Sequence, residues 1–252
     1  RKEGRMEGRE GEEGKMELTN ADQLRDRGWT SPWHLIANGE HRIVTQSTVV
    51  GAGDLALEMG SAATLERSFP PVSRGILKIE MSVRLQKATI DIEDANASVL
   101  KVYAGDREDN WACRWHYPFA WPEVGGNIYP RFYVIDGLGK KRKGIEYTEI
   151  RVQPECWYRT AAILNFASRT WEYWVDGVRA DPARHAGRAM AWWQSGAEPA
   201  YLSKVRIAST AQGKNWIDAI SIWHDGALLA HTAFNCAEGY AEGKSPPGER
   251  HQ

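Results

Sequence analysis

The chain has 252 residues, of which 42% are hydrophobic and 26% are charged, and its formal net charge is −1. This length allows one large all-β domain or two small domains with a sizeable core, so a framework of disulfides is not required. The near-zero charge argues against a general nucleic-acid binder. The chain contains no run of about 18 apolar residues, so no transmembrane helix is predicted. Tryptophan is unusually frequent, with 12 residues.

The two ends of the chain differ in character from its middle. Residues 1–16 combine charged residues with glycine and contain no aromatic residue, so they cannot bury enough apolar surface to offset the entropy of ordering. We interpret them as a disordered tail or a vector-derived extension, and they lack the apolar core of a signal peptide. The main domain is predicted at 17–232, followed at 233–252 by a C-terminal strand or linker tail.

Strand patterns dominate the middle of the chain. The clearest is 77–85, LKIEMSVRL, where apolar and polar residues alternate strictly, as in a strand with one buried face. Turns rich in glycine separate the strands. The other predicted strands are 41–48, 54–58, 98–103, 111–117, 130–135, 146–152, 157–165, 170–175, 203–208 and 216–223.

Local turn chemistry supports an antiparallel arrangement. The segment 170–180, TWEYWVDGVRA, predicts a hairpin, because Asp-Gly supplies the positive φ angles of a two-residue type I′ turn. Helical patterns are confined to 20–26 and 182–194, so the crossover helices of a parallel sheet are missing. Many short strands between glycine turns predict an all-β fold, an antiparallel two-sheet β-sandwich.

Several motifs, taken in their order, resemble the concanavalin A-like and laminin G-like jelly-roll superfamily. The matching segments are 157–166 (WYRTAAILNF), 171–177 (WEYWVDG), 205–209 (VRIAS) and 216–222 (WIDAISI), preceded by Gly28-Trp29, 55–59 and the strand at 77–85. The resemblance covers most of the chain and implies a jelly roll. Lectins, carbohydrate-binding modules, glycoside hydrolases, polysaccharide lyases and adhesion domains share this fold, so the fold does not assign the function.

The segment 110–121, NWACRWHYPFAW, is the main candidate for ligand binding. Sugar rings present apolar C–H faces that stack on Trp and Tyr, while Arg, His and Asn bond hydroxyl groups. Strand alternation predicts one face made of Trp111, Cys113, Trp115 and Tyr117, and another made of Ala112, Arg114 and His116. Packing of these aromatic rings in the core is the alternative interpretation. The predicted ligand-binding residues are Trp111, Arg114, Trp115, His116, Tyr117, Trp121, Arg131 and Tyr133.

The leading hypothesis is recognition of a polysaccharide or oligosaccharide in a concave, aromatic-lined groove. The first alternative is an enzyme on the same scaffold, a polysaccharide lyase or glycoside hydrolase, with the catalytic candidates His116, Tyr117, Arg114, Arg131 and Tyr133. The Glu-x-Asp-x-x-Glu pattern of the related glucanases is not met at 90–96 (IDIEDAN), because Thr89 stands where the nucleophile belongs. Asp91 and Glu93 share a side and form a pair or an acidic loop.

The second alternative is a structural or adhesion subunit of a surface or virion assembly, which would make the chain a homo-oligomer. The basic loop 137–144, GLGKKRKG, suits an acidic glycan or is a solvated hairpin tip. The resemblance implies a structural calcium ion near Asp218, the only cofactor expected. Of the adjacent Trp192 and Trp193, one is expected at a groove rim or against the core.

Cys113, Cys156 and Cys236 are widely separated and form no CxxC pair, so a structural zinc site is not expected. One disulfide and three free thiols are both compatible with this count. The resemblance to polysaccharide-degrading and surface systems implies an extracellular, cell-surface or periplasmic location, although no signal peptide is visible in the sequence.

Overall fold

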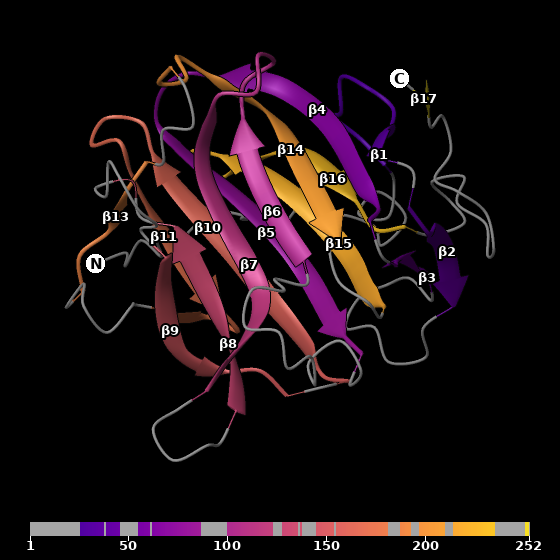
Figure 1. The fold of residues 1–252 in the computed structure, drawn as a ribbon. Coiled ribbons are helices and arrows are strands. Elements are labelled where there is room, and N and C mark those ends of the chain that lie inside the picture. Colours follow the sequence, from indigo (N-terminus) through magenta and orange to yellow (C-terminus); the bar gives the residue numbers. More distant parts are fainter. Residues whose placement is uncertain are drawn as a thin grey trace, which may run out of the picture.

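Two β-sheets facing one another form the fold in this computed structural model (Figure 1). The structure describes residues 26–37, 39–45, 55–60, 62–86, 100–122, 128–135, 137, 145–153, 155–180, 187–192, 197–209, 214–234 and 250–251, some of them by their backbone alone. These residues include no helix, so none of them provides a helical segment that could span a membrane. The predicted all-β, two-sheet class is confirmed.

Sheet A is built from strands of both halves of the chain. Its main path runs in the order β12 (Val178–Arg179), β11 (Thr170–Val175), β10 (Trp157–Asn165), β5 (Ile76–Leu85), β15 (Asn215–His224), β3 (Leu55–Met59) and β2 (His41–Thr45). Two further strands pair off this path, β13 (Met190–Ala191) with β11 and β16 (Ala227–Thr232) with β15. All the pairs in this sheet are antiparallel, as predicted.

Sheet B contains the predicted aromatic segment. Its order is β17 (Arg250–His251), β1 (His34–Ala37), β4 (Thr64–Val72), β14 (Leu202–Ser209), β6 (Leu100–Gly105), β7 (Trp111–Pro122), β8 (Ile128–Ile135) and β9 (Ile145–Arg151). The pairing of β17 with β1 is parallel, whereas the other pairs are antiparallel. The C-terminal segment therefore returns to the edge of sheet B.

The local predictions that rest on strand alternation and turn chemistry are confirmed. The strand predicted at 77–85 lies within β5, between β10 and β15. In the predicted hairpin, Asp176 and Gly177 have φ angles of 48° and 78°, and Val175 pairs with Val178. Two successive residues of positive φ are what a type I′ turn requires.

The helix predicted at 182–194 is wrong at its C-terminal end. Met190–Ala191 form β13, and Met190 pairs with Trp171 of β11. Met190 is buried, so packing against the sheet outweighs the local helical pattern. The helix predicted at 20–26 lies almost entirely outside the described residues, as does the tail at 1–16, and the domain boundaries stay predictions.

Aromatic side chains from both sheets meet in the core. Trp115 of β7 is 1% exposed and lies 6.2 Å from Trp171 and 6.3 Å from Tyr173, measured between ring centroids. Phe132 of β8 packs edge-on against Tyr173 at 6.0 Å. These contacts join β7 and β8 of sheet B to β11 of sheet A, so they hold the two layers together.

The variant Trp115→Ala should lose about 3–5 kcal/mol of the free energy of unfolding, because it removes a large buried ring and leaves a cavity between the sheets. Urea unfolding followed by circular dichroism measures this loss. Ile36→Ala is the matched control, since Ile36 is 36% exposed on β1 of the same sheet. Equal effects of the two substitutions would contradict the central role of Trp115.

Candidate functional site

The outward face of sheet A carries the polar half of the alternation in β5. The odd-numbered residues of 77–85 are buried in the core. Lys78, Glu80 and Ser82 therefore lie on the opposite face, where Lys78 is half-buried and Glu80 and Ser82 are largely covered by neighbouring side chains. The sheet thus displays a charged and polar strand along its middle.

A row of paired residues crosses this face from β11 to β15. Trp174 of β11 pairs with Ala161 of β10, and Ala161 pairs with Glu80 of β5. On its other side, Glu80 pairs with Ser221 of β15. The register thus places an indole, a carboxylate and a hydroxyl on one line across four strands.

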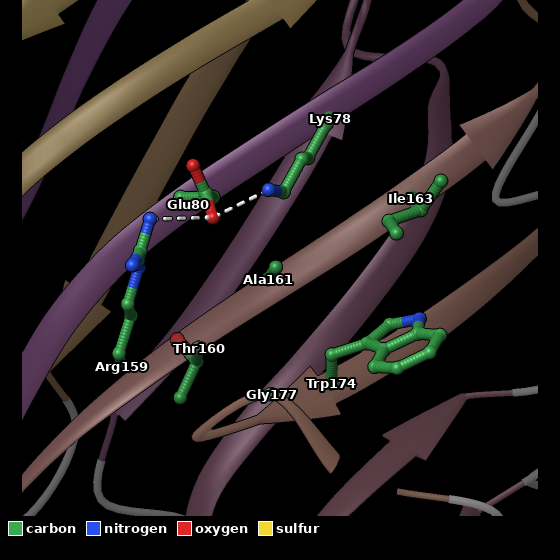
Figure 2. Close-up of a pocket in the computed structure, with 8 residues that line it drawn as sticks. All are labelled: Lys78, Glu80, Arg159, Thr160, Ala161, Ile163, Trp174 and Gly177. Atoms are coloured by element: carbon green, nitrogen blue, oxygen red, sulfur yellow. Dashed lines mark hydrogen bonds and ion pairs between the residues drawn. The ribbon is translucent and has the colours of Figure 1, made fainter. Parts of the chain in front are cut away.

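The same face is hollowed above this row. One hollow of about 350 Å³ is lined by Lys78, Glu80, Arg159, Thr160, Ala161, Ile163, Trp174 and Gly177 (Figure 2). A second, of about 240 Å³, adds Met81, Ser82, Trp157, Asp176, Ala219 and Ser221, and a third, of about 420 Å³, adds Ile76, Trp223 and Gly226. All three hollows share Glu80 and Arg159, so we treat them as one site, the sheet A trough.

The centre of the trough is a carboxylate held between two cations. Glu80 is only 7% exposed, and its Oε1 accepts from Lys78 Nζ at 2.6 Å and from Arg159 Nη2 at 3.1 Å. Figure 2 shows the two cationic side chains approaching Glu80 from opposite sides. Within the described part of the chain, Oε2 receives no hydrogen bond. The trough therefore offers one acceptor and two donor groups at a single point.

Three half-buried indoles line the trough around this centre. Trp174 donates its indole N–H to Glu172 Oε2 at 3.1 Å, which fixes the ring on β11. The indole N–H groups of Trp157 and Trp223 are shielded from solvent and have no acceptor among the described residues. Each ring leaves part of its surface exposed to the trough.

A hydroxyl of the trough is linked to a histidine behind it. Ser221 Oγ lies 2.9 Å from Nδ1 of His231 on β16. Burial lowers the pKa of His231 from its ordinary value of 6.5, the charge of Arg27 lowers it further, and Asp26 opposes the shift. The imidazole is therefore neutral at pH 7 and holds the Ser221 hydroxyl in place.

The predicted binding residue Trp111 lies on sheet B, but not on the face expected. The pairing of β6 with β7 shifts between Ala104 and Gly105, so Ala112 is an extra residue that forms a β-bulge. Trp111 thereby leaves the core face of Trp115 and packs over Gly105, where a β-carbon would lie 2.5 Å from the ring. The prediction that Trp111 and Trp115 share a face is wrong because of this bulge.

Charged side chains cover the Trp111 ring. The Arg206 guanidinium lies 4.7 Å and the Lys204 ammonium 5.3 Å from the ring centroid, and Trp111 is 6% exposed. Glu66 and Asp109 bind both cations. The ring is therefore already engaged within the protein, and little of its face is open to a ligand.

Other predicted residues divide between the core and the outward face of sheet B. Trp115 is in the core and cannot stack on a ligand in a surface groove. Arg114 is half-buried and lies 5.6 Å from the ring of Tyr103. Burial, and then the charge of Arg114, lower the pKa of the neighbouring Lys101.

The remaining predicted residues are described by their backbone alone. His116 pairs with Tyr133 of β8 and with Lys101 of β6, so the strand register brings these three positions together. The side chains of the predicted binding residues His116, Tyr117, Trp121, Arg131 and Tyr133 lie outside the described part of the structure. So do Asp91, Glu93 and most of the basic loop at 137–144.

The structure also describes Asp218, Trp192 and two of the cysteines, for which the sequence suggested roles outside the aromatic segment. Asp218 is 1% exposed on β15, and the described residues contain no group of three His, Cys, Asp or Glu side chains able to hold a metal ion, so calcium binding stays a prediction. Trp192 is buried and packs edge-on against Phe166 at 5.0 Å, in agreement with a place against the core. Cys113 and Cys156 are free thiols.

The sequence contained signals for the trough outside its main aromatic cluster at 110–121. The alternation at 77–85 already separated Lys78 and Glu80 from the core. The hairpin motif likewise placed Trp174 on the face opposite to Trp171 and Tyr173, which the structure buries. Only the pairing order of the strands brings these positions together.

Replacement of His231 by Asn should flatten the pH dependence of stability. Because the pKa of His231 is lower in the folded protein than its ordinary 6.5, the unfolded chain binds the proton first. The free energy of unfolding of the wild type should therefore be highest above pH 6.5 and decrease as the pH falls below it. Urea unfolding at several pH values tests this, and an unchanged slope in the variant would contradict the assignment to His231.

Comparison with known proteins supports the fold. No protein-family model and no curated protein matches the sequence. A solved structure titled "Sialidase" aligns with a TM-score of 0.51 and 12% identity, covering 80% of this chain and 19% of its own length. The carbohydrate-binding module CBM66 from Bacillus subtilis aligns with a TM-score of 0.41 and 8% identity, over 76% of this chain and 95% of its own. Alginate lyase AlyC3 gives a TM-score of 0.43 and 10% identity, over 67% of this chain and 74% of its own.

The chain thus spans about a fifth of the length of the sialidase that it resembles. At such low identities the likeness concerns the fold and not the activity. Together with the two facing sheets, this likeness agrees with the predicted two-sheet β-sandwich fold.

Proposed function

We propose that the protein recognises carbohydrate and that the sheet A trough binds it. The observation that carries this proposal is the combination of the half-buried indole of Trp174 with a carboxylate and two cations in one open hollow of about 350 Å³. Sugars present apolar C–H faces and a rim of hydroxyl groups, so they need stacking surfaces beside hydrogen-bonding groups. The trough supplies both on one face.

The polar groups are arranged in advance for hydroxyl recognition. Glu80 Oε2 accepts a hydrogen bond, while the exposed guanidinium of Arg159 and the ammonium of Lys78 donate to ligand oxygens. The side chain of Arg159 is 69% exposed, so a ligand reaches it without opening the core. Ser221 adds a hydroxyl whose direction depends on His231.

Sheet A is favoured over the predicted groove on sheet B by the position of the indoles. Trp115 is in the core, and Trp111 is covered by Lys204 and Arg206. Neither ring has the open face that stacking needs, whereas Trp174 and Trp223 do. A secreted or surface location suits a protein that meets polysaccharides.

A lyase on sheet B is the second candidate function. It is favoured by the register that sets His116 opposite Tyr133, since these residue types abstract and return protons in lyases. No histidine or tyrosine lines the three described hollows of the trough, so the trough itself is suited to binding. Unsaturated products, detected by ultraviolet absorbance with uronate polysaccharides, would favour the lyase.

Trp174→Ala should weaken binding of a saccharide found on a glycan array by at least about fivefold, because a stacked ring contributes about 1 kcal/mol. Isothermal titration calorimetry measures the affinity. Trp174→Phe should retain most of it, since a flat ring remains. Val178→Ala is the matched control, because Val178 lies in the same hairpin and is 62% exposed outside the trough. Unchanged affinity in Trp174→Ala would place the binding site elsewhere.

Arg159→Leu should lower the affinity about tenfold, because it removes a charged donor from the centre of the trough. Its free energy of unfolding should change by less than about 1 kcal/mol, because solvent screens the exposed guanidinium and Lys78 remains bound to the buried Glu80. Calorimetry and thermal unfolding of the same sample separate the two effects. Weak binding accompanied by a large loss of stability would argue against a direct contact with the ligand.

A further inference from the structure

We propose that the ligand of the sheet A trough is a linear oligosaccharide that lies across the strands from Trp174 to Trp223, and not a single sugar. This inference rests on the proposed function and adds the size and direction of the ligand. It follows from the spacing of the two indoles and from what lies between them.

The strand register fixes the separation of the indoles. Trp174 lies in the row that runs through Ala161 and Glu80 to Ser221, and Trp223 is two residues beyond Ser221 on the same strand. Three strand spacings of about 4.8 Å and two residues of about 3.4 Å give a separation of about 16 Å between the backbones of the two tryptophans. That is the length of roughly three to four linked pyranose rings.

The space between the two indoles is continuous. The hollow beside Trp174 and the hollow beside Trp223 share Lys78, Glu80, Arg159 and Ile163. The described lining between the two rings includes no further aromatic side chain. One stacking surface thus lies at each end, and the hydrogen-bonding groups lie in the middle.

This arrangement matches the chemistry of a chain and not of a monosaccharide. A single ring covers one indole and leaves the other without a contact. In an oligosaccharide, the outer rings stack on Trp174 and Trp223 while an inner ring bonds Glu80 and Arg159. Because the two stacking contacts belong to one molecule, the second forms at little further entropic cost.

The test measures affinity against chain length. Cello-oligosaccharides and oligomannuronates of one to six units serve as the neutral and the acidic probe, each titrated by calorimetry. In the series that binds, affinity should rise up to about four units, by about tenfold or more overall, and then level off. Affinity that does not change with length would overturn the inference while leaving the proposed function in place.

Variants at the two ends make the test specific. Trp223→Ala and Trp174→Ala should each abolish the gain in affinity from the longer oligomers, so that affinity no longer rises with chain length in either variant. Ala227→Ser on the neighbouring β16 is the control, because Ala227 is exposed outside the trough. If Trp223→Ala unfolds, Trp223→Phe takes its place and should keep the gain from length. Absence of binding to either series and to a glycan array would instead overturn the proposed function.

Discussion

The packing of the two sheets against each other is the constraint on which the rest of the structure depends. Trp115, Trp171 and Tyr173 fill the space between the layers, and each fixes which residues of its strand point inward. Because side chains alternate with a period of two, the outward residues are fixed at the same time. A slip of one residue in β5 would turn Lys78 and Glu80 toward the apolar core, so the packing of the core also fixes the residues of the trough.

The trough combines charged groups and apolar surface around one buried carboxylate. A carboxylate that is only 7% exposed has lost most of its hydration, and Lys78 and Arg159 compensate for this loss through one of its oxygens. The second oxygen has no described partner. A hydroxyl group of a ligand can complete this set without rearranging it, which reduces the cost of binding.

On sheet B, the same residue types contact one another and leave little surface open to a ligand. There an indole, two cations and two carboxylates also meet, at Trp111, Lys204, Arg206, Glu66 and Asp109. Their contacts are made among themselves, and the ring is covered. Aromatic and charged composition alone therefore does not distinguish a binding surface from a closed structural cluster, whereas the open hollow does.

The sequence by itself determined the all-β class, the alternating strand at 77–85 and the Asp176-Gly177 hairpin, because these depend on neighbouring residues and local turn geometry. It did not determine which indoles are open. The bulge at Ala112 separates Trp111 from Trp115, and Glu80, Arg159, Trp174 and Trp223 come from strands distant in the sequence. Their meeting depends on pairing order and register, which long-range packing decides, so only the tertiary structure could assemble the site.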